Sequence, residues 1–400
     1  MGLLRHIACV AALHVVALLG IVGYELYALT SPHFSYAIAP PDAGAPPMKA
    51  AVFKEFGAAS VVHVEDIQRP ACCAPNQVLV KVDVAALNPV DFKQRRMPAP
   101  SAMLPLPAVT GKDFSGSVMQ VGEGVAGFQI EDHVFGMLPL LGQPWGAFQE
   151  YVVVDASIIA KTPRTAGSKA AALPLVGLTV LHALAPVLAK WEAAGESSTG
   201  KAILVHAGSG GVGSFAIQYC KHVLGMRVTT TTSSGNEELV RRLGADQVVD
   251  YRAQRFEDVV RDADVVLDTV AQEYELRTLQ SETVLKQGGR GHYVHVISTD
   301  WQPSSREANP VYMMLPLVKK WVLSAMARLG RGVFYHCNPV TPDGAGLARI
   351  AKWVDEGRIQ PVIDRTFQLE DAAKAHEYLE TGRAKGKVLV AVALGAAMSE

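Results

Sequence analysis

The residues best suited to chemistry are glycines that follow a short apolar stretch. Residues 201–207 read KAILVHA, and Gly208, Gly210 and Gly213 follow in the spacing G-x-G-x-x-G before a helical segment. The first glycine permits a tight turn, the second lets the backbone approach a pyrophosphate, and the third lets the helix pack on the strand. The helix N-terminus adds amide donors and partial positive charge. The pattern predicts a dinucleotide site at Gly208, Ser209, Gly210, Gly211, Val212 and Gly213. A turn that serves only packing is the alternative.

The end of the next strand bears on which dinucleotide binds. Enzymes that use NAD usually place a carboxylate about 20 residues after the glycines, where it binds the ribose 2′-hydroxyl. Residues 230–236 read TTTSSGN and contain no acid. Hydroxyl and amide groups can donate to a 2′-phosphate without repelling it, so the sequence favours NADPH. The predicted contacts are Thr232, Ser233, Ser234 and Asn236. These residue types are also common in turns, which is the simpler interpretation.

Two further strand ends supply candidates. Tyr251 follows the stretch QVVD, and Asp268 and Val270 end the stretch DVVLDTV. Ligands of open parallel sheets usually lie at the carboxyl ends of the strands. We therefore expect Tyr251 to contact the 2′-phosphate and Asp268 and Val270 to line the cofactor site. The alternatives are a tyrosine that covers a strand end and an aspartate that caps the next helix.

The elements that position these residues change in character along the chain. From Met48, short alternating segments separated by Gly and Pro predict an antiparallel barrel or rolled sheet. After Ala170, helical segments alternate with brief apolar strands, which predicts βα units and a parallel sheet. The final stretch, KVLVAVAL from Lys387, matches the first half. The predicted fold class is α/β, with a β domain at 48–172 and 336–400 and a doubly wound domain at 173–335.

Residues 1–47 are interpreted as a membrane or targeting segment with a linker. Residues 7–29 are apolar and, at about 1.5 Å per residue, long enough to cross a hydrocarbon layer of about 30 Å. We expect an N-terminal apolar helix that forms a single membrane span and anchors the protein. A secretory signal and a mitochondrial presequence are the alternatives. Residues 30–47 are rich in Pro and Ala and predict a spacer.

The amino-acid composition argues against a nucleic acid partner and a metal site. Lys and Arg number 37 against 38 Asp and Glu, which gives a net charge of −1, and no basic block occurs. We therefore expect no nucleic acid partner. The hydrophobic share of 49% indicates a folded protein. The five cysteines include no Cys-x-x-Cys pair, so no metal site is predicted.

From Met48 onward the sequence resembles the zinc-free quinone-oxidoreductase branch of the medium-chain dehydrogenases/reductases. Within that branch it is most similar to the mitochondrial reticulon-interacting oxidoreductases. The matching segments are NPVD (88–91), GKDFSGSVMQVGEGV (111–125), DHVFG (132–136), GAFQEYVVV (146–154), AALPLVGLTVLHAL (171–184), the glycine motif, ELVRRLGADQVVDY (238–251), VVLDTV (265–270) and RAKGKVLVAV (383–392). The resemblance implies a GroES-like β domain joined to a Rossmann domain, with the nicotinamide in the cleft between them.

The resemblance also bears on the reaction. Where zinc-dependent members carry metal ligands, this sequence has residues 85–88 (AALN) and 111–113 (GKD), which do not make a tetrahedral zinc site. Without a Lewis acid, the easier acceptors are electron-poor quinones and enones. In the family, the loop that holds Asn88 and Asp91 lines the substrate cleft. We expect Asn88 to bond the acceptor oxygen or the nicotinamide ribose, and Lys93 to contact the developing oxyanion. Asn-Pro and Asp are also typical of a plain turn, and a solvated surface charge is the alternative for Lys93.

At the C-terminal end, Arg383 resembles the family's arginine near the 2′-phosphate, and Lys387 lies in the adjoining approach to the strand. Ordinary surface charge is the alternative for both. The expected function is reduction of a small-molecule quinone or enone by NADPH, in a chain that the resemblance predicts to be a homodimer. An enoyl-thioester reductase would use a Tyr proton donor in the loop at 92–107, which contains none. A nucleotide-binding interaction protein without catalysis is the third reading.

Overall fold

The computed structural model describes residues 44–71, 73–96, 104–140, 144–271, 273–296, 328, 332–337 and 339–393. The predicted membrane span at 7–29 lies outside these residues. One described helix, Pro174–Ala193, is long and apolar enough to cross a membrane, and 67% of its apolar window is buried inside the protein. Its burial fits a core helix.

The strands of the first half lie in two sheets, which are antiparallel apart from the parallel pair of β15 and β16 contributed by the C-terminal segment. A three-stranded sheet has the order β2 (Val62–Ile67), β1 (Met48–Phe53) and β4 (Ala108–Val109). A seven-stranded sheet has the order β15 (Ile363–Gln368), β16 (Lys387–Ala391), β3 (Gln77–Leu87), β5 (Asp113–Val121), β6 (His133–Met137) and β8 (Ile159–Lys161), with β7 (Tyr151–Asp155) also paired to β3. β16 runs antiparallel to β3, so the C-terminal segment returns to the first sheet, as predicted.

The second half builds a six-stranded parallel sheet. Its order is β11 (Gln247–Asp250), β10 (Arg227–Thr232), β9 (Ala202–Val205), β12 (Val265–Asp268), β13 (His292–His295) and β14 (Phe334–His336). This is the doubly wound order, in which the direction of winding reverses between β9 and β12. The apolar run of β12 is buried throughout, as expected for a sheet covered on both faces. The α/β fold class is therefore confirmed.

Helices cover the sheets and the region between them. Their bounds are α2 (Pro89–Arg96), α3 (Pro174–Ala193), α4 (Gly211–Gln218), α5 (Glu237–Arg242), α6 (Phe256–Val259), α7 (Glu273–Gln280), α9 (Gly344–Asp355) and α10 (Ala372–Glu380). Short 3-10 turns lie at Ala59–Val61, Ala156–Ile158, Gly167–Ala172, Ser234–Asn236 and Leu369–Asp371, and a π-helical turn lies at Tyr219–Val223. Pro174 suits the start of α3 because its missing N–H would have no partner there.

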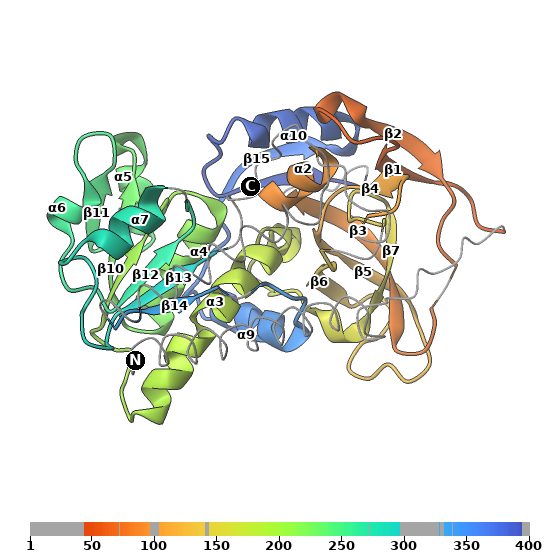
Figure 1. The fold of residues 1–400 in the computed structure, drawn as a ribbon. Coiled ribbons are helices and arrows are strands. Elements are labelled where there is room, and N and C mark those ends of the chain that lie inside the picture. Colours follow the sequence, from red (N-terminus) through yellow and green to blue (C-terminus); the bar gives the residue numbers. More distant parts are fainter. Residues whose placement is uncertain are drawn as a thin grey trace, which may run out of the picture.

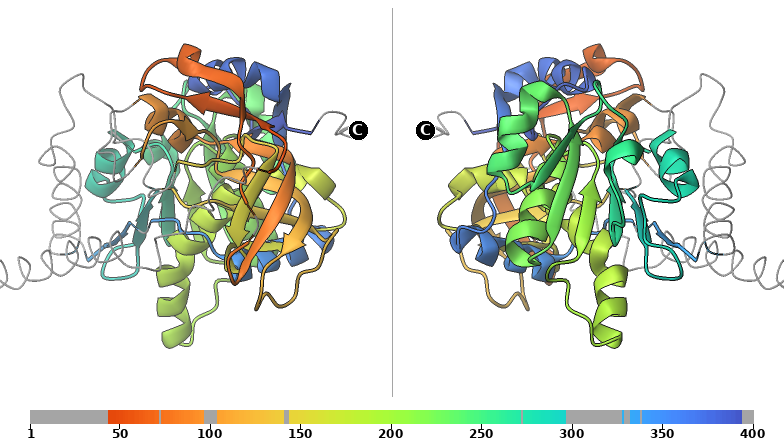
Figure 2. Two further views of the ribbon diagram at one scale, coloured as in Figure 1. Left: turned by 90° about the vertical axis from the view of Figure 1, so that its right-hand side faces the viewer. Right: turned by 90° about the vertical axis from the view of Figure 1, so that its left-hand side faces the viewer.

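The two halves lie at opposite ends of the molecule. In Figure 1 the green and teal strands of the parallel sheet are on one side and the orange and yellow strands on the other, with α3 between them. The blue C-terminal segment with α10 lies above the strands of the first half (Figures 1 and 2). β14 ends at His336, so its last residue lies beyond the predicted boundary at 335. The domain boundaries themselves stay predictions.

Candidate functional site

The glycine motif lies between β9 and α4, at the carboxyl edge of the parallel sheet. A Cβ on Gly213 would lie 2.3 Å from the Ala207 carbonyl oxygen, and one on Gly208 would lie 2.1 Å from Thr230 Oγ1. These two glycines are therefore required by packing. A Cβ on Gly210 would meet nothing closer than the Ala207 carbonyl oxygen at 3.4 Å. Gly210 thus leaves space on the open side of the turn.

The start of α4 has donors to offer a ligand. Gly210 occupies the N-cap in extended conformation and no side chain caps the helix. The first amides of a helix have no partner within the helix, and they favour an anion. Gly211 and Val212 form the first turn, and both are half-buried. The open space at Gly210 and the uncapped helix fit a pyrophosphate group.

The end of β10 is linked to the glycine turn by side chains. Ser209 Oγ accepts hydrogen bonds from Thr232 Oγ1 at 3.0 Å and from Asn236 Nδ2 at 3.1 Å. Asn236 Nδ2 also lies 3.3 Å from Ser233 Oγ, and Ser234 begins the short turn that follows. The structure therefore brings these five predicted residues together. Thr232 is buried and orients Ser209, while Ser233 follows the strand and is half-buried.

The other strand ends differ in how exposed they are. Tyr251 follows β11 and is 49% exposed, and its backbone N–H donates to the Thr232 carbonyl at 3.2 Å. Asp268 is fully buried at the end of β12, where Oδ1 accepts from the Val270 and Ala271 amides at 2.8 Å each. Its Oδ2 accepts from the Tyr293 hydroxyl. These contacts cap the turn that precedes α7 (Glu273–Gln280) rather than the helix itself, and they hold the Val270 amide.

A buried polar cluster lies where β3, β5 and β16 meet. Asn88 follows β3, Asp113 begins β5 and Lys387 begins β16, and all three side chains are at least 95% buried. Asn88 Nδ2 donates to Asp113 Oδ2 at 2.9 Å, and Lys387 Nζ donates to Asn88 Oδ1 and, at 3.0 Å, to Asp113 Oδ2. Asp113 Oδ1 accepts from the Leu175 amide at 2.9 Å. Lys387 is therefore bonded to the predicted acceptor-binding amide and is not an ordinary surface charge.

Two further charged groups are buried beside Asn88. Asp91 Oδ2 accepts from the Asn88 backbone N–H at 2.7 Å, and Asp91 and Lys112 are each 2% exposed. Burial raises the pKa of Asp91 to about 7, against the opposing charge of Lys112. Burial lowers the pKa of Lys112 to about 8, against the opposing charge of Asp91. Lys93 lies in α2, two residues after Asp91, and is half-buried.

Residues 386 and 387 join the polar cluster to the glycine turn. The Gly386 N–H donates to the Ser209 carbonyl at 2.8 Å, and Gly386 forms a parallel bridge with Gly210. Gly386 has φ of +81°, a conformation that favours glycine. Arg383 is exposed in the loop that precedes Gly386. The sequence did not identify Lys112, Asp113 or Gly386 as site residues. Residues 111–113 (GKD) entered the sequence analysis only because metal ligands are absent there.

Two protein-family models match the chain. "Alcohol dehydrogenase GroES-like domain" matches residues 74–164, and "Zinc-binding dehydrogenase" matches residues 243–390. The donors of the cluster do not fit zinc, because Asn88 offers an amide and the Asp113 carboxylate is held by the Lys387 ammonium. In the described part of the chain, no three His, Cys, Asp or Glu side chains gather as a metal site.

Several characterised proteins are similar over most of the chain. A 2-methylene-furan-3-one reductase from Solanum lycopersicum is 35% identical, and the match covers 86% of this chain and 79% of that protein. The mitochondrial NAD(P)H oxidoreductase RTN4IP1 of Danio rerio is 32% identical, with 86% and 91% covered. An NADPH-dependent alkenal/one oxidoreductase of Arabidopsis thaliana chloroplasts is 33% identical, with 86% and 79% covered.

Solved structures agree with these relatives. The quinone oxidoreductase from Coxiella burnetii superposes with a TM-score of 0.71 at 30% sequence identity, and the match covers 87% of this chain and 100% of that structure. The GroES-like match, the doubly wound sheet order and the similar proteins agree with one another. The chain therefore belongs to the medium-chain dehydrogenase/reductase superfamily, in its quinone-oxidoreductase branch.

Proposed function

We propose that this chain is an NADPH-dependent oxidoreductase that reduces quinones or other conjugated carbonyl compounds. The observation that carries the proposal is the contact of residues 386 and 387 with both the glycine turn and Asn88. It supports the proposal because two consecutive residues join the side chain that we predict to bind the acceptor to the turn that we predict to bind the nucleotide. The activities named for the tomato and Arabidopsis relatives, a furanone reductase and an alkenal/one oxidoreductase, belong to the same chemical class.

The residues present fit the cofactor. The turn at 208–213 would hold the pyrophosphate, and Ser233, Ser234 and Asn236 would face the 2′-phosphate. Once bound, NADPH supplies the hydride. The protein itself must hold the cofactor and the acceptor in the orientation that hydride transfer requires, and must exclude water from between them.

Asn88 is suited to orient the acceptor. Its side-chain nitrogen carries two protons, and Asp113 accepts one of them at 2.9 Å. Lys387 holds the amide oxygen, so the amide cannot rotate freely. We propose that the second N–H donates to the acceptor carbonyl. A donor fixed in advance stabilises negative charge as it develops on the acceptor oxygen.

The acceptor must also gain a proton. A quinone yields a stabilised oxyanion that solvent can protonate, whereas an enone needs a proton at carbon. The Asp91 carboxyl, which is bonded to the Asn88 backbone N–H and whose pKa burial raises to about 7, is the group we propose to supply that proton. We propose a zinc-independent reaction, because an amide and an ion-paired carboxylate occupy the cluster.

The test is an acceptor screen with the purified protein. NADPH oxidation is followed with quinones, enones and enoyl thioesters, and the Asn88→Ala variant is compared with wild type. We expect the quinones or enones to be reduced and kcat/KM to fall by about 100-fold in the variant, the scale of losing one fixed donor. NADPH affinity, measured by fluorescence titration, should change less than threefold.

Two outcomes contradict the proposal. If enoyl thioesters are the preferred acceptors, the chain is an enoyl-thioester reductase. If NADPH binds, no acceptor is reduced and Asn88→Ala changes nothing, the chain is a nucleotide-binding interaction protein. Asn76→Ala, at the exposed turn before β3, is the matched control and should leave turnover unchanged.

We also propose a mitochondrial location, because the RTN4IP1 relatives are mitochondrial proteins. The membrane span at 7–29 and the homodimer stay predictions. Fusing residues 1–47 to a fluorescent protein tests the location: delivery to mitochondria supports it, and retention in the secretory pathway contradicts it.

A further inference from the structure

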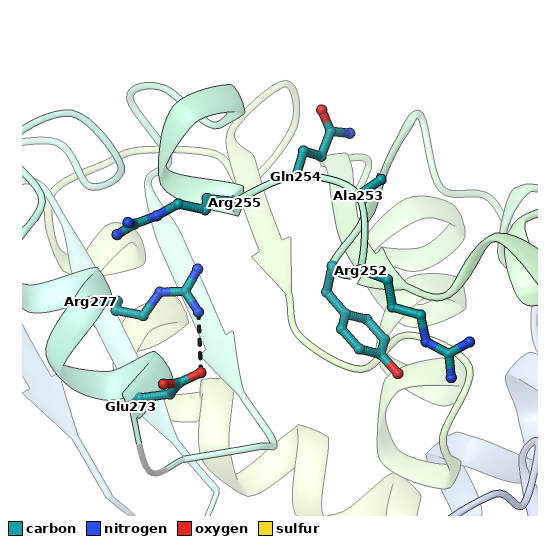
Figure 3. Close-up of a pocket in the computed structure, with 7 residues that line it drawn as sticks. Arg252, Ala253, Gln254, Arg255, Glu273 and Arg277 are labelled. Carbon is teal, nitrogen blue, oxygen red and sulfur yellow. Dashed lines mark hydrogen bonds and ion pairs between the residues drawn. The ribbon is translucent and has the colours of Figure 1, made fainter.

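A hollow of about 440 Å³ lies at the carboxyl end of β11, and its rim carries three arginines. Two segments line it, the loop that follows β11 and the first turns of α7 (Figure 3). The lining residues are Tyr251, Arg252, Ala253, Gln254, Arg255, Glu273 and Arg277. Neither the sequence motifs nor the function proposed above uses the arginines.

The three arginines are not equivalent. Arg277 donates to both oxygens of Glu257 at 2.7 Å and lies 3.4 Å from Glu273. Arg255 donates to the same Glu257 at 2.7 Å. Although burial opposes it, hydrogen bonds from Arg277 and Arg255 lower the pKa of Glu257 to about 2, so this carboxylate stays ionised. Acids thus offset the charges of Arg255 and Arg277.

Arg252 differs because its charge is not offset. Within the described part of the chain, no carboxylate oxygen lies within 4.0 Å of its guanidinium, and its nearest described partner is the ring of Tyr251, whose centroid is 5.7 Å away. The backbone N–H of Arg252 donates to Asp250 Oδ1 at 3.0 Å, which fixes the turn. Figure 3 shows Arg255 and Arg277 on one side of the hollow and Arg252 on the other.

The position of Arg252 relates to the cofactor through the strand order. β9, β10 and β11 are neighbours, and their carboxyl ends carry the glycine turn, residues 233–236 and Arg252 respectively. Neighbouring strands lie about 4.8 Å apart, so about 10 Å separates the ends of β9 and β11. Thr232 pairs with Asp250, and the Tyr251 amide bonds the Thr232 carbonyl. The turn that carries Arg252 therefore adjoins the predicted 2′-phosphate site on the side away from the pyrophosphate.

We propose that Arg252 is a specificity-determining residue that binds the 2′-phosphate of NADPH. This inference rests on the proposed function and adds a charged contact to the hydroxyl and amide donors at the end of β10. A planar guanidinium can donate two parallel hydrogen bonds to a phosphate, and such charge-assisted pairs are stronger than neutral ones. The ring of Tyr251 restricts the arginine on one side. The positive charge of Arg252 therefore favours binding of NADPH, which carries the 2′-phosphate, over NADH.

The test measures binding without turnover. Dissociation constants of NADPH, NADH and adenosine 2′,5′-bisphosphate are determined by calorimetry for the wild-type chain, Arg252→Gln and Arg255→Gln. We expect Arg252→Gln to weaken NADPH and the bisphosphate by about tenfold and NADH by less than twofold. Arg255→Gln, which removes a charge already held by Glu257, is the matched control and should change all three by less than threefold. Arg252→Lys, which keeps the charge without the planar fork, should lose about threefold.

The outcomes separate this inference from the proposed function. If wild type prefers NADPH and Arg252→Gln leaves that preference intact, or weakens both dinucleotides equally, the role of Arg252 is refuted and the function stands. Equal losses in Arg252→Gln and Arg255→Gln refute it as well. If wild type does not distinguish NADPH from NADH, both the inference and the cofactor choice fall. Melting curves check that each variant folds.

Discussion

The glycine turn and the polar cluster lie side by side but are built differently. The turn is uncharged, comes from six consecutive residues and leaves open space at Gly210. The cluster is charged, buried and assembled from residues as far apart as 299 positions, Asn88 and Lys387. A turn that binds a ligand through backbone amides buries no charged side chain, so its binding function need not lower stability. A buried charge cluster must satisfy its own groups first, so its changes act on the fold as well as on the site.

The largest effect is expected from Gly210→Val. A Cβ at Gly210 meets nothing closer than 3.4 Å, so the variant should abolish NADPH binding by blocking the pyrophosphate while the melting temperature stays close to wild type. Titration calorimetry and thermal melts measure the two. Gly213→Ala is the comparison, because its Cβ would lie 2.3 Å from a carbonyl oxygen and should lower the melting temperature instead. Retained affinity in Gly210→Val would contradict the cofactor site.

Lys387→Met tests the cluster side of the comparison. Removing one partner leaves the Asp113 carboxylate buried without its ion pair, which should cost about 3–5 kcal/mol of unfolding free energy in urea denaturation. The double variant Lys387→Met/Asp113→Asn should recover part of the loss. Lys385→Met, an exposed lysine two residues away, is the control. A loss under 1 kcal/mol would mean that the cluster does not stabilise the fold.

Acid should weaken the fold at two buried histidines, one beside the glycine turn and one on α10. Burial lowers the pKa of His206, beside the glycine turn, to about 4 and that of His376, bonded to Thr110 at 3.0 Å, to about 3. The unfolded chain binds a proton near pH 6.5, so stability is complete above that pH and is lost as pH falls through 4. Each residue contributes roughly 3 kcal/mol or more. Chemical denaturation between pH 7.5 and 4 measures the slope, which His206→Gln and His376→Gln should each flatten. A flat profile in wild type would contradict the prediction.

The smallest effect is a change in preference at the end of β10. Ser233→Asp places a carboxylate where it repels a 2′-phosphate and can accept from a ribose hydroxyl, so the ratio of NADPH to NADH affinity should fall about tenfold. Fluorescence titration with both cofactors measures the ratio. Ser197→Asp adds the same charge in an exposed loop before β9, at the other edge of the sheet, and should leave it unchanged. An unchanged ratio in Ser233→Asp would show that this residue does not contact the 2′ position.

The sequence predicted the local parts of this molecule well. The stretches KAILVHA, QVLVKVDVAAL and KVLVAVAL contain β9, β3 and β16, because a strand's alternation or apolar run is written in consecutive residues. The return of the last strand to the first sheet was also predicted. The family resemblance supplied the GroES-like half and the Rossmann half, and the comparisons confirmed both.

The polar cluster could not be predicted in the same way. Lys112 and Lys387 look like surface charges in sequence, since lysine is almost never fully buried unless it is paired. Their burial follows from the pairing of β16 with β3 and of β3 with β5, which brings distant residues to one point. For the same reason, Asp268 could be placed at the correct edge of the sheet, but its partner Tyr293 could not be identified.

The contact between Gly386 and Ser209 sets an order of events during synthesis. The nucleotide turn is synthesised long before residue 386. The Ser209 carbonyl and the Asn88 side-chain oxygen gain these hydrogen-bond donors only when residues 386 and 387 have been added. A premature stop anywhere upstream of Gly386 therefore damages the two regions together. Nucleotide affinity can serve as a simple reporter that translation has passed this point.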